Sequence, residues 1–333
     1  MVNDGFTEIV VADVGGTHAR FAVATLASGQ VVSLDHVTRV RTSLFPTLAK
    51  AWMAFAEAIE RPLPTQASLA VAAQVKPEAF KLTNGEWLIR PRHVADELGV
   101  ERVELINDFA AVAHAVGQLD ELSFEHLCGE QKPLPNNGIV SIVGPGTGLG
   151  VAQLHRCGED YRVIETEAGH IDFGPVDEFE DALVAQLRPV DKRASAERIV
   201  SGRGLALFYD ALVPVGSDEP SFESNQALWT AALSGTCRRA EAALELYCRA
   251  LGSITSNIAL AQRADAVVIA GGLGWRLREQ LPQSGFVQRF SAKGHLTASM
   301  KSLPVKILTH PEPGLFGAAA AFAKLPTRDS AAE

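Results

Sequence analysis

The sequence has little positive charge, few cysteines and no long apolar run, and each shortage excludes a class of protein. Its 333 residues carry a formal net charge of −9. No basic stripe or tail is available to neutralise phosphates, so we expect no nucleic-acid partner. No apolar run approaches the roughly 20 residues that span a bilayer, and the N-terminus is acidic where a signal peptide is basic. We therefore expect no membrane association and a cytoplasmic protein.

Cysteine usage and length together limit the architecture. The four cysteines are scattered, with no Cys-x-x-Cys metal motif, and they are too few for a disulfide framework in a chain this long. They indicate thiols in a reducing compartment. With 47% hydrophobic residues, the chain is long enough for about two domains, each with its own core. A two-domain enzyme acting on small ligands is the expectation.

Two loops rich in glycine and threonine each follow a run of strand-forming residues. The first covers residues 13–17 (Asp-Val-Gly-Gly-Thr), and the second covers residues 144–150 (Gly-Pro-Gly-Thr-Gly-Leu-Gly). Glycine lets backbone N–H groups approach an anion closely, and the threonine hydroxyl adds another donor. The pair predicts one polyphosphate held from both sides.

The better-known phosphate loops do not fit these strings. A Walker loop needs Gly-x-x-x-x-Gly-Lys-Ser/Thr, which the chain lacks. A dinucleotide fingerprint opens a helix, whereas residues 151–155 and the turn at Cys157-Gly158 indicate a hairpin. Around the first loop, residues 9–12 are apolar and residues 20–25 resume a strand. Both loops are therefore predicted to be hairpin turns.

The remaining pattern mixes short strands with helices. Strands are predicted near residues 8–13, 19–25, 30–40, 68–72, 103–106, 139–143, 266–270 and 305–308. Helices are predicted at residues 45–60, 109–117, 178–187, 196–199, 226–263, 275–281 and 313–322. A strand-turn-strand loop in each half indicates an internally duplicated architecture.

Several ionisable residues stand where strands end. Asp108 follows the strand ending in Asn107, where ligands gather in α/β sheets, but an aspartate there also serves as a helix N-cap. Glu167 and His170 have the i, i+3 spacing of paired metal ligands, yet the glycine between them argues against a helix. A polar ligand pocket or a plain surface turn fits them better than a metal site.

Two further acidic groups have simpler explanations from the residues alone. Glu197 lies in a helix-start pattern, where a carboxylate simply faces the helix dipole. The acidic run 177–181 is typical of a solvated first helical turn. Neither is assigned a function on this basis.

Taken in order, these strings resemble the bacterial glucokinases outside the repressor/kinase family, within the sugar-kinase, actin and Hsp70-like ATPase superfamily. The resemblance covers nearly the whole chain. Its motifs are residues 12–17 with Ala19-Arg20, 82–84 with Trp87, 107–109, 144–150, 167–173, 195–198 with 201–202, 271–272, and 313–314 with Gly317.

The resemblance implies an ATP-dependent glucokinase that phosphorylates the 6-hydroxyl of D-glucose, with Asp108 as general base. The sugar would be bound by Asn107, Asp108, Glu167, His170 and Glu197, which replaces the helix-dipole interpretation of Glu197. The nucleotide would contact Ala12, Asp13, Val14, Gly15, Gly16, Thr17, Gly146, Thr147, Gly148, Gly271 and Gly272. Mg²⁺ would face Asp13 through water, and the protein would be a homodimer.

The fold implied by the resemblance is a two-lobed, actin-like (ribonuclease H-like) α/β fold. Residues 1–118 with 308–326 would form a small α/β domain, and residues 119–307 a larger, helix-rich α+β domain. Residues 327–333 would be a frayed tail. Sugar and nucleotide would bind in a cleft between the lobes, which closes on them.

Three positions depart from the family pattern. His18 replaces the asparagine after Gly-Gly-Thr, Gln74 replaces the proline before Val75, and Ala168 replaces a glycine of the Glu-Gly-Gly-His string. These departures bear on loop geometry and on sugar stringency rather than on the reaction class.

Three other functions compete with this interpretation. A kinase of another hexose, or one using a different phosphoryl donor, is the main alternative. A sugar-responsive repressor is disfavoured because the chain is acidic and reaches its first phosphate strand near its start, without the cysteine-rich zinc motif of the repressor/kinase family. A filament-forming actin relative is disfavoured by the Asn107-Asp108 and Glu167/His170 groups.

Overall fold

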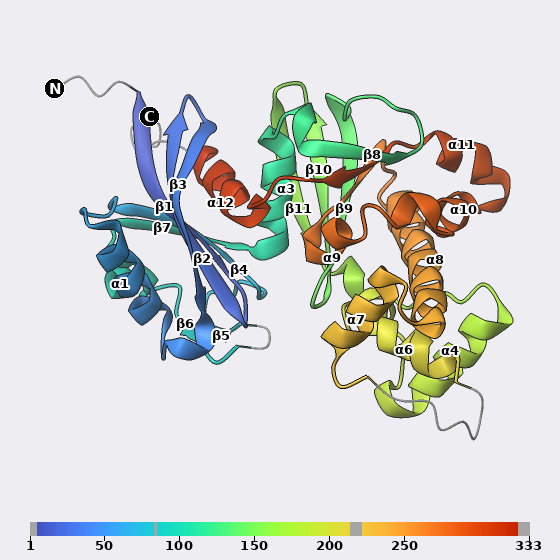
Figure 1. The fold of residues 1–333 in the computed structure, drawn as a ribbon. Helices are drawn as coiled ribbons and strands as arrows, with labels where there is room; N and C mark the ends of the chain where they lie inside the picture. The colour runs from blue at the N-terminus through green and yellow to red at the C-terminus, as the bar shows by residue number, and fades with distance from the viewer. Residues whose placement is uncertain (1–4, 83–84, 214–221, 326–333) are drawn as a thin grey trace. The chain divides into compact units, whose positions relative to one another are not determined.

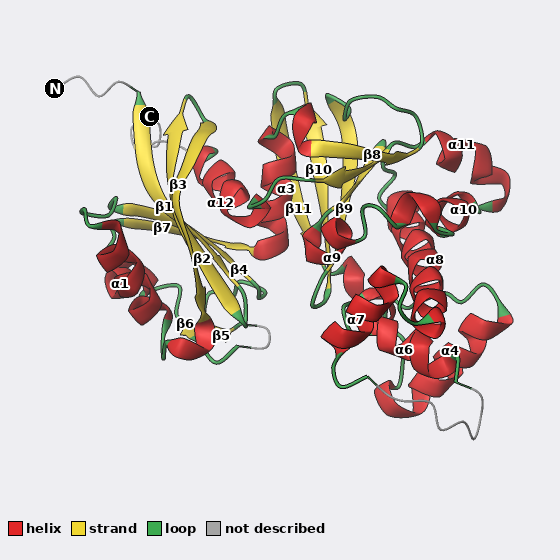
Figure 2. Ribbon diagram, in the orientation of Figure 1, coloured by secondary structure: helices red, strands yellow, loops and turns green. Residues whose placement is uncertain are grey.

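The structure is a computed structural model that describes residues 5–82, 85–213 and 222–325, and its elements divide between two units (Figures 1 and 2). Unit 1 contains the chain up to Asp120 and again from His310, and unit 2 contains Glu121–Thr309. The tail predicted for residues 327–333 and the Thr83-Asn84 pair lie outside the described residues.

Unit 1 is built on a five-stranded sheet of order β3-β2-β1-β4-β7. Strands β3, β2 and β1 are antiparallel, whereas β1, β4 and β7 are parallel. The strands are β1 (Phe6–Val14), β2 (His18–Ala27), β3 (Gln30–Arg41), β4 (Gln66–Val71) and β7 (Arg102–Asn107), and a separate hairpin pairs β5 (Phe80–Lys81) with β6 (Leu88–Ile89). The helices are α1 (Leu48–Ile59), α2 (Val94–Leu98), α3 (Asp108–Gln118) and α12 (Pro313–Ala323).

The central strand β1 is buried on both faces, which explains its unbroken apolar run. Successive side chains of a strand point to opposite faces. Ile9 and Val11 therefore pack in the cluster that includes α12, while Val10 and Ala12 pack in the cluster that includes α1. Figure 1 shows α1 on one face of this sheet and the pair α3 and α12 on the other.

Helices α3 and α12 contact each other through backbone. Gly317 of α12 lies so close to α3 that a Cβ atom built there would be 1.7 Å from the carbonyl oxygen of Ala111. No side chain fits in that space. The alanine-rich sequence of both helices permits this approach and lets the pair cover the sheet as one layer.

Unit 2 contains a six-stranded sheet of order β11-β10-β9-β12-β13-β8 and most of the helices. The strands are β8 (Phe124–Cys128), β9 (Asn137–Pro145), β10 (Leu149–Cys157), β11 (Asp160–Thr166), β12 (Ala266–Ile269) and β13 (Val305–Leu308). The helices are α4 (Glu178–Asp191), α5 (Ala196–Val200), α6 (Gly204–Ala211), α7 (Asn225–Ser234), α8 (Arg238–Ala261), α9 (Gly271–Arg276), α10 (Phe286–Ser291) and α11 (Thr297–Ser302).

Five strands follow the same order in both sheets, as the two loops indicated, and the sheet of unit 2 adds β8 at its edge. Each unit contains a three-stranded antiparallel meander whose first strand, β1 or β9, also pairs in parallel with a strand from later in the chain; in unit 2 this meander follows β8. Both glycine-threonine loops are hairpin turns, between β1 and β2 and between β9 and β10. The hairpin predictions are confirmed.

Other predicted elements need correction. The helix predicted at 275–281 is wrong, because α9 begins at Gly271 and ends at Arg276. The segment 226–263 is mostly helical, as predicted, and consists of two helices separated at Gly235, whose φ of 70° ends α7. The acidic run 177–181 is not fully solvated, since Glu180 is buried and lies 2.8 Å from Arg289.

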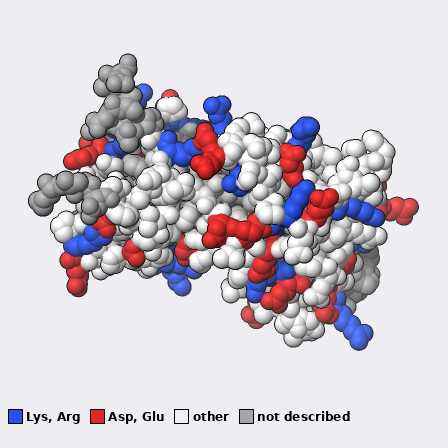
Figure 3. Space-filling model, turned by 90° about the horizontal axis from the view of Figure 1, so that it is seen from above, with Lys and Arg blue, Asp and Glu red and all other residues white. Residues whose placement is uncertain are grey.

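The surface drawn in Figure 3 shows acidic and basic side chains interspersed rather than separated by sign. Among the described residues, no helix is both long enough and apolar enough to cross a membrane.

Gly317→Ala tests the close approach of α3 and α12. The added methyl group must displace the Ala111 carbonyl, so we expect the free energy of unfolding to fall by at least about 1–3 kcal/mol. Urea unfolding measures the change. Gly174→Ala is the matched control, because a Cβ at Gly174 meets nothing within 4 Å. Equal stability of the two variants would contradict the packing described.

Candidate functional site

The first glycine-threonine turn is fixed by hydrogen bonds to its carbonyl oxygens. Gly15 N–H donates to the carbonyl of His18 at 2.9 Å and closes the turn. Thr42 donates its hydroxyl to Gly16 O at 2.6 Å and its N–H to Thr17 O at 3.1 Å. Within the described part of the chain, no hydrogen bond engages the N–H groups of Gly16 and Thr17. The turn therefore offers two backbone donors to an anion.

Asp13 lies in β1, opposite Arg20 of β2. Arg20 Nη1 lies 3.3 Å from Asp13 Oδ2 and 3.4 Å from Glu312 Oε2, so one guanidinium group serves two carboxylates. Burial raises the pKa of Asp13 more than Arg20 lowers it, and the charge of Glu312 raises it further. A Cβ at Gly314 would lie 2.7 Å from Asp13 Oδ2, so glycine is required beside this carboxylate.

Glu312 is a site residue that the sequence did not reveal. It is separated from Asp13 by almost the whole chain, and no spacing rule connects them. The family string containing Pro313-Gly314 was the nearest signal, because it brings the start of α12 to the end of β1.

Asn107 and Asp108 lie at the same sheet edge as the first turn. Val14 of β1 pairs with Val71 of β4, and Val71 pairs with Asn107 of β7, so the three parallel strands end in one row. Gly15 and Asp108 each follow a member of that row. This is the carboxyl edge of the parallel strands, where ligands bind in α/β sheets.

The helix cap at this edge is Asn107, so the alternative that Asp108 caps α3 is wrong. Asn107 Oδ1 accepts from the N–H groups of Phe109 at 2.8 Å and Ala110 at 3.1 Å, and Nδ2 donates to Ala73 O at 3.3 Å. Asp108 is the first residue of α3 and is half-buried. The cap fixes the backbone from which the Asp108 carboxylate projects.

The second glycine-threonine loop is contacted by the backbone of three other segments, while Thr147 at its tip is exposed. Gly146 N–H donates to Gly148 O at 2.8 Å, and no hydrogen bond from the described residues engages the N–H groups of Thr147 and Gly148. Three glycines from other segments contact carbonyl oxygens of the loop. A Cβ would lie 2.0 Å from Leu149 O at Gly169, 3.2 Å from Gly146 O at Gly202, and 2.8 Å from Pro145 O at Gly271.

Glu167 and His170 flank a single 3-10 turn, Ala168–His170. The sequence argued against a helix here, and the structure has only this short turn, which brings His170 Nε2 within 3.8 Å of Glu167 Oε2. Their side chains are 68% and 58% exposed, which is typical of a turn open to a ligand or to solvent. No cluster of three or more potential metal ligands occurs among the described residues.

Glu197 lies in α5 and contacts the second loop directly. Ser195 is the cap of this helix, its Oγ accepting from Arg198 N at 3.2 Å. The Glu197 carboxylate instead accepts from Leu149 N at 3.0 Å. The simple helix-dipole interpretation therefore misses its main contact. An isolated bridge between Asp172 and Ser195 ties the Glu167/His170 turn to the start of α5.

Each unit thus gathers its own part of the predicted set. In unit 1, the first turn, Asp13 and the Asn107-Asp108 pair share one sheet edge. In unit 2, the loop at 144–150 is contacted by Gly169 of the Glu167/His170 turn, by Glu197, and by Gly271 at the start of α9. Gly272 is exposed beside it, with nothing within 4 Å of a Cβ position.

Two of the departures are accommodated by this geometry. The turn closes through the backbone carbonyl of His18, so its side chain is not needed for closure. Burial and the neighbouring Arg39 and Arg41 lower the pKa of that imidazole. The family string has glycine at both positions 168 and 169. Only position 169 has no space for a Cβ, so the alanine at position 168 is accepted.

This chain is similar to known glucokinases over nearly its whole length. The Glucokinase family model matches residues 10–325. A glucokinase of Zymomonas mobilis is 48% identical over 316 residues, covering 95% of this chain and 98% of the relative. A crystal structure of glucokinase from an Antarctic psychrotroph matches with a TM-score of 0.80 and 32% identity, covering 94% of this chain and 98% of the other.

More distant structures share the fold. A ROK family glucokinase from Streptomyces griseus, solved with glucose and AMPPNP, has a TM-score of 0.62 at 18% identity and covers 94% of this chain and 98% of the other. The architecture is therefore a mixed α/β fold of the sugar-kinase type.

Asp13→Asn tests the electrostatics of the first turn. Because the pKa of Asp13 is raised in the folded state, the carboxyl favours folding only when protonated, and this contribution is lost as pH rises through the raised pKa. The asparagine variant should therefore be at least as stable as wild type at pH 7, and any advantage should shrink as pH falls. Arg20 keeps Glu312 as a partner. Urea unfolding across pH measures this, and a clear loss of stability at pH 7 would contradict it.

Proposed function

The chain belongs to the glucokinase family, and we propose that Asp108 is the general base of its reaction. That reaction is the ATP-dependent phosphorylation of glucose, which gives glucose 6-phosphate and ADP. The observation that carries the proposal is the shared sheet edge, at which Asp108 and the first phosphate turn both follow the ends of parallel strands.

Asp108 suits the role of base because its neighbour does the capping. Asn107 supplies the acceptor for the first N–H groups of α3, so the Asp108 carboxylate is not required as the cap. A carboxylate in this position removes the proton from the 6-hydroxyl as the oxygen attacks the phosphoryl group. Positioning and charge stabilisation supply the rest of the rate enhancement.

Asn107, Glu167, His170 and Glu197 are proposed to bind the other sugar hydroxyls. The support is chemical: a mixed set of donors and acceptors distinguishes hexoses, because each buried polar group left unpaired costs about 1–3 kcal/mol. Asn107 uses Oδ1 twice and Nδ2 once within the protein, which leaves one amide N–H for a hydroxyl. Asn107 therefore makes a smaller contribution to the sugar than the family role suggests.

The two glycine-threonine loops are proposed to bind the phosphates of ATP. The N–H groups of Gly16, Thr17, Thr147 and Gly148 support this, together with two exposed threonine side chains. Exposed Gly272, beside Gly271 at the start of α9, leaves room for the adenine. The backbone of residues 12–15 and Gly146 completes the proposed nucleotide contacts.

Mg²⁺ is proposed as the metal that accompanies ATP, with Asp13 facing it through water. Magnesium keeps several waters and is bound by one or two carboxylates plus substrate phosphates. The donor set fits, because Asp13 is a carboxylate at the first turn whose side chain is 23% exposed. The described residues contain no cluster of three potential metal ligands that would form a dedicated cage. Bound there, the ion supplies positive charge to the phosphates.

Three broader features are also proposed. The repeated meander in both units supports a place in the actin-like, ribonuclease H-like superfamily. The free thiols of all four cysteines support a cytoplasmic location. The family resemblance supports a homodimer, for which sedimentation equilibrium would give twice the mass of the chain.

Asp108→Asn tests the proposed base. The variant keeps the shape of the side chain and one acceptor oxygen but cannot accept the proton, so kcat should fall by about 10²- to 10⁴-fold while glucose affinity is kept. Coupled ADP-release kinetics and calorimetric glucose binding measure the two effects. Asp96→Asn, at an exposed position of α2, is the control and should retain wild-type kcat. If Asp108→Asn keeps more than about a tenth of the wild-type kcat, Asp108 is not the base.

A further inference from the structure

Glu197 touches the second loop at two successive residues. Its Oε2 accepts from Leu149 N at 3.0 Å. The same oxygen lies 2.4 Å from the position of a Cβ built on Gly148, and Oε1 lies 3.7 Å from it. The carboxylate is therefore in direct contact with the loop backbone, and one oxygen is committed to it.

The segment that carries Glu197 holds the loop at its other side as well. Gly202 N–H donates to Gly146 O at 2.7 Å, and Trp229 Nε1 donates to Gly202 O at 2.7 Å. Ser201 N–H donates to the carbonyl of Glu197 at 2.9 Å, which fixes the spacing between the two contacts. Residues 197–202, here called the bracket, therefore contact the loop at both Gly146 and Leu149.

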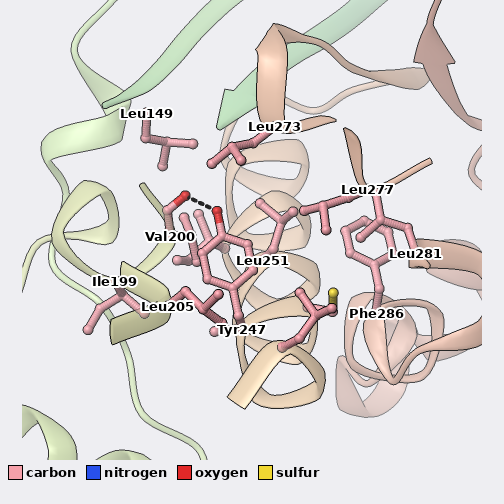
Figure 4. Close-up of a cluster of buried hydrophobic side chains, with 14 of the residues drawn as sticks. Leu149, Ile199, Val200, Leu205, Tyr247, Leu251, Leu273, Leu277, Leu281 and Phe286 are labelled. Atoms are coloured by element: carbon pink, nitrogen blue, oxygen red, sulfur yellow. Dashed lines mark hydrogen bonds between the residues drawn. The ribbon is translucent and has the colours of Figure 1, made fainter. Parts of the chain in front are cut away.

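The bracket is supported by a buried core. Leu149, Val200 and Leu273 belong to the same cluster of buried side chains (Figure 4). The Tyr247 hydroxyl donates to the carbonyl of Val200, as the dashed line in Figure 4 shows. Because protein interiors are close-packed, displacement of α5 is expected to be transmitted through this core to the loop.

We propose that Glu197 is a positioning residue for the phosphate loop in addition to a sugar ligand. This inference rests on the proposed function, in which the loop binds phosphate and Glu197 binds a hydroxyl. Oε2 holds the loop through Leu149, and Oε1, which has no hydrogen bond from the described residues, faces the sugar. One carboxylate then joins the two substrate sites of unit 2.

Three substitutions separate the two roles. Glu197→Gln keeps a carbonyl oxygen for Leu149 N–H but removes the charge. Glu197→Ala removes both, and it leaves Leu149 N–H without its acceptor. Gly148→Ala keeps the glutamate but forces its carboxylate away, because the new methyl group meets Oε2 at 2.4 Å.

Binding of Mg·AMPPNP and of glucose, each alone, is measured by calorimetry on the full chain. Glu197→Gln should keep nucleotide affinity within about twofold, whereas Glu197→Ala should lower it about tenfold or more, since an unpaired buried N–H is left behind. Both should weaken glucose binding. Gly148→Ala should also weaken glucose binding, although it removes no atom that faces the sugar.

Gly146→Ala is the comparison within the same loop. Its Cβ meets no protein atom within 4 Å, so the added methyl group does not displace Glu197. Because Gly146 is one of the proposed nucleotide contacts, the variant should weaken nucleotide binding and leave glucose binding at the wild-type level. Thermal unfolding identifies any variant that fails to fold, and the Glu197→Gln and Glu197→Ala pair carries the test if Gly148→Ala does fail.

Nucleotide affinity of Glu197→Ala equal to that of wild type would overturn the positioning role. Equal loss in Glu197→Gln and Glu197→Ala would also overturn it, because the retained acceptor would then have no effect. The proposed function fails differently: wild-type glucose affinity in Glu197→Gln and Glu197→Ala would remove the sugar role, while the nucleotide measurements would still decide the loop role.

Discussion

The loop at residues 144–150 depends on backbone contacts that only glycine permits. Gly169, Gly202 and Gly271 come from three different segments, and each brings its backbone against a carbonyl oxygen of the loop. These contacts fix the loop from outside, so its own N–H groups at Thr147 and Gly148 are not needed to hold it in place. The rest of the site in unit 2 follows, because the segments that supply those glycines also carry Glu167, His170 and Glu197.

In unit 1, a side-chain cap and an ion pair, rather than glycine contacts, hold the proposed site residues in place. Asn107 fixes the start of α3, and the register of β1, β4 and β7 sets Asp108 at the same edge as the first turn. Asp13 is maintained there at some cost, since burial raises its pKa and opposes its charged form. A charge that does not favour folding is typical of residues kept for function.

Much of this was predictable from sequence because the signals were local. The Gly15-Gly16 pair predicted the first hairpin, and the alternating glycines of residues 144–150 followed by a strand-forming run predicted the second. Asp108 was placed correctly at a strand end, but the choice between Asn107 and Asp108 as cap required the structure. Helix ends were less predictable: α9 begins at Gly271, where a glycine pair was expected to precede the helix.

Contacts between distant segments lay beyond sequence reasoning. Nothing in the spacing connects Glu312 to Arg20, or Glu197 to Leu149, because both contacts depend on how separate elements pack. The same holds for Ala168. The family pattern has glycine at both 168 and 169, and only the structure shows that the glycine at 169 is the one in contact with the backbone of Leu149.

The most direct test of the account is ADP release with Mg·ATP, measured in a coupled assay with glucose, mannose, fructose, N-acetylglucosamine and no sugar. The account predicts strong stimulation by glucose above the other sugars and little release without a sugar. Equal release with and without sugar would contradict it, because the polar groups assigned to glucose would then have no part in the reaction.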